Sequence, residues 1–120
     1  MIGGLTMLLS GCTKSPPTMA HYRPVSHWVL ALRDPDPAAR VQAVRILSNV
    51  GPADPAVLIA LIGAIKDRDL QVRREAILAL LKLGPAAKSA TPALREAQAD
   101  EDAAVREYAT RALRRIDSGR

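Results

Sequence analysis

Apolar residues recur along this chain at the spacing of an α-helix. Val72, Ala76, Leu80 and Leu83 are separated by three or four positions, which places their side chains on one face of a helix. No segment shows the strict alternation of apolar and polar residues that is typical of a half-buried β-strand. The pattern therefore predicts an all-α protein.

This helical pattern occurs three times at an interval of 33 residues. The copies are DPDPAARVQAVRILSNVG at 34–51, DRDLQVRREAILALLKLG at 67–84 and DEDAAVREYATRALRRID at 100–117. The match continues upstream of each copy, which predicts repeats at 19–51, 52–84 and 85–117 and a short tail at 118–120. A two-helix unit cannot bury its apolar face alone, so we expect the array at 24–117 to stack into an α-solenoid.

The first helix of each repeat is expected at about 24–33, 55–66 and 92–99. In the second and third repeats, Asp54 and Thr91 stand where an N-cap belongs, and Pro55 and Pro92 would occupy the first helical position. The second helices are expected to begin after N-caps at Asp36, Asp69 and Asp102, and to end at Gly51, at Gly84 and near Asp117.

Composition and charge narrow the picture. The chain has 120 residues, of which 48% are apolar and 24% charged, which is the balance of one small globular domain. It has no Phe and one Trp, so the core must be built from Leu, Ile, Val and Ala. Trp28 aligns with Leu61 and Leu94, which favours a core position over a binding aromatic. The net charge of +5 is spread along the chain, which argues against a nucleic-acid partner.

The first twelve residues, MIGGLTMLLSGC, do not fit the repeat. They resemble a bacterial lipoprotein signal that ends in a Leu-Ser-Gly-Cys lipobox, which implies cleavage before Cys12, a lipid on Cys12 and a location in the cell envelope. Residues 13–23, which contain two adjacent prolines, are expected to be a linker. Because no Lys or Arg precedes Cys12, two alternatives stay open: the true start lies upstream, or the segment is an ordinary helix with Cys12 as a buried thiol.

The repeated motif D-x-D-x-x-V-R-x-x-A-x-x-A-L-x-x-L-G resembles HEAT-like repeats, particularly the short type of the phycobilisome-lyase family. Its best matches are Asp67, Val72, Arg73, Ala76, Ala79, Leu80, Leu83 and Gly84. The first repeat departs from the motif at Ala39 and Ile46, and the third at Asp117. The resemblance implies a solenoid whose second helices line the concave side.

The resemblance also implies a role for the repeated Asp and Arg residues. These are Asp34 and Arg40, Asp67 and Arg73, and Asp100 and Arg106. In such repeats each guanidinium is expected to reach carboxylates and carbonyl oxygens of neighbouring units, forming a ladder. Arginine suits this role because its planar fork donates several hydrogen bonds at once. The alternative, a catalytic pair of acid and cation, does not explain why the residues recur in every repeat.

No other residues form a pattern that indicates catalysis or a cofactor. His21 and His27 are the only histidines, and their spacing does not resemble a metal site. The sequence has no Gly-rich phosphate loop and no serine with a plausible His and acid set. We therefore expect no enzyme activity, no cofactor and no small-molecule substrate.

Three sets of equivalent positions on the second helices are predicted to face away from the core. They are Gln42, Glu75 and Tyr108; Arg45, Leu78 and Arg111; and Ser48, Leu81 and Arg114. Leu78 and Leu81 are apolar where the other repeats carry polar residues, and Tyr108 should neighbour them. An apolar patch ringed by Arg45, Arg111 and Arg114 has the composition of a protein interface. The alternative is that the two leucines are incidental surface or partly covered.

These observations favour a membrane-tethered module that binds a protein, without catalytic activity. One alternative is a subunit or chaperone-like partner of a lyase-type enzyme, because related repeats occur in such proteins. Another is a cytosolic adaptor without lipid. The sequence does not identify the partner.

Overall fold

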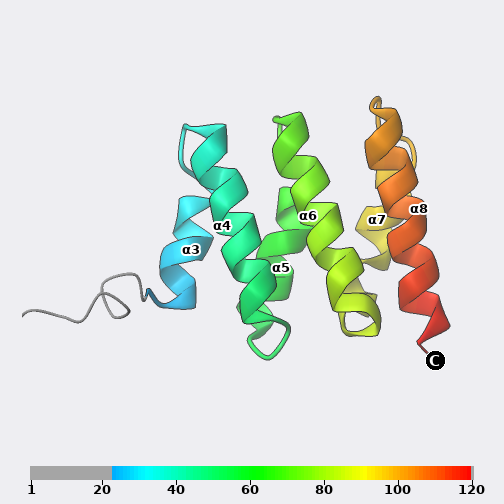
Figure 1. Cartoon of the computed structure of the whole chain (residues 1–120), viewed down its shortest axis with the longest axis horizontal. Helices are drawn as coiled ribbons and strands as arrows, with labels where there is room; N and C mark the ends of the chain where they lie inside the picture. The colour runs from blue at the N-terminus through cyan, green and yellow to red at the C-terminus, as the bar shows by residue number, and fades with distance from the viewer. Residues whose placement is uncertain (1–22, 120) are drawn as a thin grey trace, which may run out of the picture.

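The chain folds into a row of helices without any strand in the part that the structure describes (Figure 1). The structure is a computed structural model, and it describes residues 23–119. The helices are α3 (Val25–Ala31), α4 (Pro37–Val50), α5 (Pro55–Ala64), α6 (Leu70–Leu83), α7 (Thr91–Ala97) and α8 (Ala103–Ser118), with a 3-10 helix, η1 (Gly84–Ala90), before α7. The protein is therefore an all-α solenoid, as the repeat pattern predicts.

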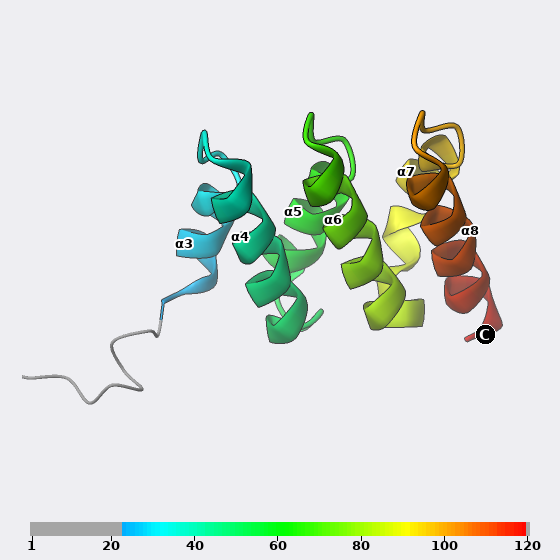
Figure 2. The same ribbon diagram turned by 45° about the horizontal axis from the view of Figure 1, so that its top comes forward.

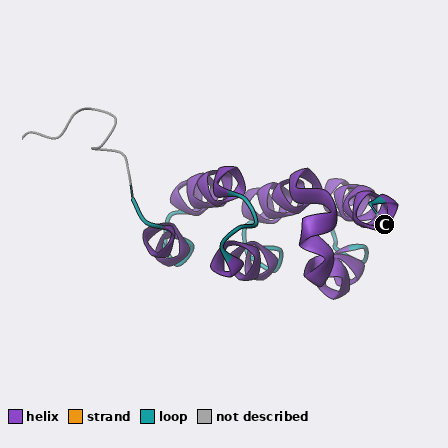
Figure 3. Ribbon diagram, turned by 90° about the horizontal axis from the view of Figure 1, so that it is seen from below, coloured by secondary structure: helices purple, strands orange, loops and turns teal. Residues whose placement is uncertain are grey.

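The helices form two layers. Seen from below, with the array running across the view, α4, α6 and α8 lie in one layer and α3, α5 and α7 in the other (Figure 3). The three helices of the first set run side by side with a similar tilt (Figure 2). Their mutual contacts dominate the packing between repeats, since α6 contacts both α4 and α8 extensively. The core is a continuous seam of Leu, Ile, Val and Ala between the layers.

Aspartates begin most of the helices. Asp36, Asp54 and Asp69 each accept a hydrogen bond from the backbone N–H two residues later, at 3.0, 2.9 and 2.9 Å. Asp102 accepts one from Val105, at 2.9 Å. Each side chain satisfies a backbone donor that has no partner inside the helix, which fixes the direction in which the helix leaves the turn.

The prediction that Thr91 is an N-cap is wrong. Thr91 is the first residue of α7 with helical dihedral angles, and its hydroxyl donates to the carbonyl oxygen of Lys88 at 2.7 Å. The chain enters α7 from η1, so it is already helical at Ala90 and has no extended residue there to act as a cap.

The first helices also end earlier than predicted. At the end of each one the chain tightens into a turn with bonds between residues three apart, such as Arg33 N–H to the carbonyl oxygen of Leu30 at 2.9 Å. This tightening is common at helix ends, and here it leads each helix into the aspartate turn.

Burial at equivalent positions shows which side of each second helix faces which neighbour. Val44 and Ile77 are fully buried, whereas Thr110 at the same position of the last repeat is only half-buried. This position therefore faces the following repeat. Conversely, Ile46 is half-buried while its equivalents Ala79 and Ala112 are buried, so that position faces the preceding repeat.

The two ends of the described array consequently differ in chemistry. The first repeat leaves apolar side chains partly open at its outer face, among them Ile46 and Val50. Trp28 packs against the core but stays half-buried, whereas its equivalents Leu61 and Leu94 are fully buried. The last repeat places the polar Thr110 where an interior repeat has Ile77.

Gly51, which follows the second helix α4, should tolerate substitution poorly, in contrast to Gly63. Gly51 has φ 87° and ψ −174°, a conformation that is essentially restricted to glycine. We expect Gly51→Ala to lower the free energy of unfolding by about 2 kcal/mol. Gly63 lies in α5, where an added Cβ meets nothing within 4 Å. Gly63→Ala should raise the free energy of unfolding by about 0.8 kcal/mol, because alanine favours a helix.

Urea unfolding followed by circular dichroism measures both changes, with the slope of the transition as a check that the unfolded state is unaltered. Equal shifts of the two midpoints would contradict the role assigned to the backbone conformation at Gly51.

Candidate functional site

A ladder of arginines links the repeats at their aspartate turns. Arg40 is 4% exposed and binds the carboxylate of Asp67 in the next repeat with two parallel hydrogen bonds, Nε to Oδ2 at 3.0 Å and Nη2 to Oδ1 at 3.1 Å. Its third nitrogen donates to the carbonyl oxygens of Asp34 and Pro35 in its own turn, at 2.7 and 3.1 Å. The guanidinium thus ties two turns together. The Asp67 carboxylate and nearby acids raise the pKa of Arg40 above its ordinary value, so this charge is permanent.

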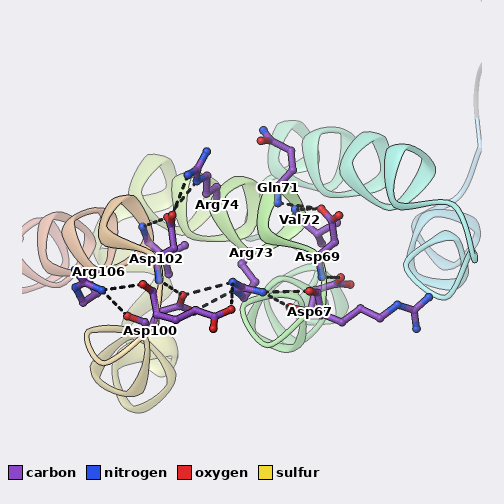
Figure 4. A network of polar contacts seen from close by, with 12 residues as sticks. Asp67, Asp69, Gln71, Val72, Arg73, Arg74, Asp100, Asp102 and Arg106 are labelled. Carbon is purple, nitrogen blue, oxygen red and sulfur yellow. Dashed lines mark hydrogen bonds and ion pairs between the residues drawn. The ribbon is translucent and has the colours of Figure 1, made fainter.

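Arg73 repeats this arrangement one unit later, where it lies between the turns of Asp67 and Asp100 (Figure 4). It donates to the carbonyl oxygens of Asp67 and Arg68 at 3.1 and 3.3 Å, and its Nε lies 3.1 Å from Asp100 Oδ2. This second contact is looser than the first, because Nε is poorly aligned for a hydrogen bond and Nη2 reaches Asp100 Oδ1 only at 3.5 Å. Glu101 adds a distant ion pair at 3.7 Å.

Each ladder aspartate also closes its own turn. The carboxylates of Asp34, Asp67 and Asp100 accept a hydrogen bond from the backbone N–H two residues later, at 2.8, 2.9 and 2.9 Å. The last arginine, Arg106, donates to the carbonyl oxygens of Asp100 and Glu101 at 2.8 and 3.1 Å. These contacts give the ladder residues a structural use in every repeat, through one recurring geometry.

The structure adds a contact between repeats that the sequence did not indicate. Arg74 forms two hydrogen bonds with the Asp102 carboxylate, Nη2 to Oδ1 at 3.0 Å and Nε to Oδ2 at 3.3 Å (Figure 4). The Arg74 guanidinium, together with the N–H of Val105, lowers the pKa of Asp102 below its ordinary value. The sequence gives little signal for this pair, because the equivalent of Arg74 is Val41 in the first repeat and Glu107 in the third.

A cleft between α4 and α6 contains one of the two candidate interface leucines. It has a volume of about 310 Å³, and it is lined by Arg45, Ser48, Asn49, Glu75, Leu78, Ala79 and Lys82. Two polar contacts span it from helix to helix, Arg45 Nη2 to Glu75 Oε1 at 2.8 Å and Lys82 Nζ to Asn49 Oδ1 at 2.7 Å. Leu78 is half-buried here. The cleft therefore combines an apolar side chain with a polar rim.

The expectation that Ser48 and Leu81 face away from the core is wrong. Ser48 is buried, and Leu81 is half-buried and packs against the core. Arg114, at the equivalent position of the last repeat, is exposed. The burial of the first two follows from the stacking, because a following repeat covers this side of the helix. Tyr108 is likewise half-buried against the core.

The arginines predicted to ring this patch are not all beside it. Arg45 lines the cleft, with Leu78. Arg111 is exposed on α8 and forms an ion pair with Glu107 on the same helix, with Nη2 and Oε1 2.6 Å apart. Neither Arg111 nor Arg114 lines the cleft between α4 and α6. The structure therefore brings together Leu78 and Arg45 and leaves the two α8 arginines on the last repeat.

Sequence reasoning missed the most exposed large apolar side chains of the described region, which lie in the layer of first helices. Ile59 on α5 is 71% exposed and Leu30 on α3 is 64% exposed. Ile59 lines a groove of about 350 Å³ together with Val29, Leu32, Arg33, Ala60, Gly63, Ala64 and Asp67. The sequence of α5, PAVLIALIGA, could have indicated this exposure. It is apolar on all sides, so in a two-layer fold some of its apolar residues must face solvent.

Some candidate residues fall outside the described residues. Cys12, the signal segment 1–12 and His21 are among them. His27 stacks edge-on against Trp28, with ring centroids 4.8 Å apart. Residues 23–119 contain no cluster of His, Cys, Asp or Glu that could hold a metal ion. Over the same stretch, none of the helices has both the length and the apolar character needed to cross a membrane.

Comparison with known proteins identifies the repeat. A family model described as HEAT repeats matches residues 25–118. The crystal structure of an engineered protein is similar, with a TM-score of 0.64 and 22% sequence identity. The similarity covers 82% of this chain but 47% of the engineered protein, so this chain spans about half of its length. At that identity the likeness concerns the fold alone. No curated protein matches the chain.

Arg68 and Arg73 both lie close to the turn that begins at Asp67. Replacing each of them by alanine should change the free energy of unfolding by very different amounts. Arg73 is largely buried in the ladder, whereas Arg68 is exposed and contributes its backbone carbonyl to that ladder. Arg73→Ala leaves the Asp100 carboxylate without its main partner and should lower the free energy of unfolding by about 3 kcal/mol. Arg68→Ala keeps the carbonyl and should cost less than about 0.5 kcal/mol.

Thermal melts of the two variants, recorded in the same buffer, decide between these expectations. Coincident melting curves would show that the ladder does not hold the repeats together.

Proposed function

The chain belongs to the HEAT-repeat family, and on that premise we propose that it is a protein-binding module, without catalytic activity, tethered to a bacterial membrane through a lipid on Cys12. HEAT repeats generally mediate contacts between proteins. Their stacked helices present an extended surface on which partners can bind. The partner of this chain is proposed to be a protein, with no cofactor and no small-molecule substrate.

The cleft between α4 and α6 is the observation that carries the binding proposal. Leu78 is half-buried in the cleft, and charged and amide side chains from both helices surround it. An apolar centre within a polar rim is the usual anatomy of a protein interface. The two contacts that span the cleft, Arg45 with Glu75 and Lys82 with Asn49, would hold this surface in shape before a partner arrives.

Groups on the rim can also orient the partner. Arg45 is 61% exposed in spite of its ion pair, so its guanidinium can donate hydrogen bonds to a second acidic group from outside. The Glu75 carboxylate raises the pKa of Arg45, which keeps the charge fixed. Rim charges of this kind act mainly on the rate and specificity of association. We therefore expect a partner with an apolar side chain flanked by acidic residues.

The membrane tether rests on the sequence before the array. Leu9, Ser10 and Gly11 precede Cys12 as in a lipobox, and the repeat begins several residues later. Eleven residues of linker at 13–23 would span on the order of 20 Å, which would hold the solenoid close to a membrane surface. A single lipid chain gives only weak membrane binding, so a stable anchor would require the several chains of a mature lipoprotein.

Metabolic labelling with a fatty-acid probe tests the tether. We expect the wild-type chain to incorporate the probe and Cys12→Ala to incorporate none, because Cys12 is the only cysteine of the chain. The wild-type product should also be shorter by residues 1–11. Equal labelling of both chains, or labelling of neither, would contradict the proposed anchor and favour the cytosolic adaptor.

Affinity capture with two matched variants tests the binding surface. We expect the wild-type chain to capture a specific protein from the envelope fraction, and Leu78→Asp to lose it by about tenfold or more, because burying an unpaired charge in an interface is costly. Ile59→Asp introduces the same charge at an exposed apolar residue of the other layer and should capture as the wild type does.

The pattern of retention identifies the surface in use. Loss of the captured protein with Ile59→Asp alone would move the site to the first-helix layer, contrary to the proposal. Circular dichroism checks that both variants are folded. Mass spectrometry of the captured protein separates an adaptor from the alternative role, since recovery of a lyase subunit would support a place in that enzyme's assembly.

A further inference from the structure

Within residues 23–119 the first ladder aspartate and the last ladder arginine each lack a partner in a neighbouring repeat, and these two open groups are complementary. At the last repeat, Arg106 uses one nitrogen, Nη1, for the carbonyl oxygens of its own turn. Among residues 23–119 its Nε and Nη2 have no carboxylate partner, although the equivalent atoms of Arg40 bind Asp67. At the first repeat, the Asp34 carboxylate accepts only the N–H of Asp36 from the described residues.

We propose that a second copy of this chain stacks on the end of the first, with Arg106 of one copy bound to Asp34 of the next. The contact would continue the series that Arg40 with Asp67 and Arg73 with Asp100 begin. Its geometry is already present twice inside the molecule, where it joins one repeat to the next. The same hydrogen bonds therefore specify what can occupy the open end, which is a repeat that offers an aspartate turn.

Other positions at the same junction are compatible with this stacking. Inside the array Arg45 reaches across to Glu75, and the equivalent pair at the junction is Arg111 with Gln42 of the next copy. Lys82 donates to Asn49 inside the array, and the equivalent pair at the junction is Arg115 with Asn49 of the next copy. Both junction pairs join an arginine to an amide oxygen, which can accept its hydrogen bond.

Stacking would also cover the open apolar end of the first repeat. Ile46 and Val50 are more exposed there than their equivalents in the other repeats. The face that would cover them carries Thr110 and Arg114, whose methyl group and aliphatic stem can pack on apolar atoms. This face is more polar than an interior one, so the association should be weaker than the contact between repeats and should depend on concentration.

One position opposes the stacking. Inside the array Arg74 binds Asp102, but the equivalent pair at the junction is Glu107 with Asp36 of the next copy, which are both acidic. Glu107 is already paired with Arg111 at 2.6 Å, which offsets its charge. This feature again favours a reversible contact. Because the two joined surfaces differ, the contact does not close on itself as a twofold dimer would, and it can extend into a chain of molecules.

Sedimentation velocity of the full chain, with a reductant to keep Cys12 from forming disulfides, tests the proposal. The mean sedimentation coefficient should rise with protein concentration. Arg106→Glu and Asp34→Arg each place like charges at the junction, and each alone should weaken association by about tenfold or more. An equimolar mixture of the two variants places opposite charges at every junction and should restore association.

Two further variants separate an effect on association from an effect on folding. Asp34→Asn retains an oxygen for the N–H of Asp36 while removing the charge, and it should still weaken association. Arg68→Glu makes the same change of charge in the turn of the central repeat and should have no effect. A chain that stays monomeric at all concentrations would overturn the proposal. So would association that survives Arg106→Glu, which points to contact between two first repeats, or a mixture that fails to associate.

Discussion

The structure depends on one hydrogen-bonding geometry, in which an arginine binds the carbonyl oxygens of its own turn and the aspartate of the next. Arg40 shows it most completely, with four hydrogen bonds to three residues. A guanidinium can do this because its five donors point outward in one plane. Apolar side chains such as Leu80 tolerate small shifts along the stack, whereas a bidentate contact does not. The ladder therefore fixes the register of the repeats.

The core and the turns place different requirements on the sequence, and this difference explains which positions are free to vary. The core requires only apolar residues of suitable size, and the turns require an Asp, a cap and an Arg. Positions on the outer side of α4, α6 and α8 belong neither to the core nor to the turns. They can therefore differ between repeats and acquire a binding function. Leu78 is such a position, since its equivalents are Arg45 and Arg111. Among the described residues, the same regularity leaves Arg106 and Asp34 without a partner in a neighbouring repeat.

The binding surface and the tether would cooperate if both proposals hold. A lipid on Cys12 would confine molecules to two dimensions near the membrane, which would raise their local concentration and favour weak contacts between copies or with a partner. A linker at 13–23 would limit how far the solenoid could move from the membrane. The tether and the stacking contact rest on separate residues, so the fatty-acid labelling and the sedimentation experiment can succeed or fail independently.

The sequence by itself determined the helical class, the repeat unit and the residues of the turns, because these follow from local periodicity and from motifs that recur three times. It also indicated that Asp67 and Arg73 have a structural use. Only the tertiary structure decided which side of each helix is covered. It showed that Leu81 packs against the core and that Arg74 binds Asp102. It also showed that the chain enters α7 through η1, without an N-cap, and that Ile59 is exposed to solvent. These outcomes depend on how neighbouring repeats are rotated against each other, and a period of three or four residues does not specify that rotation.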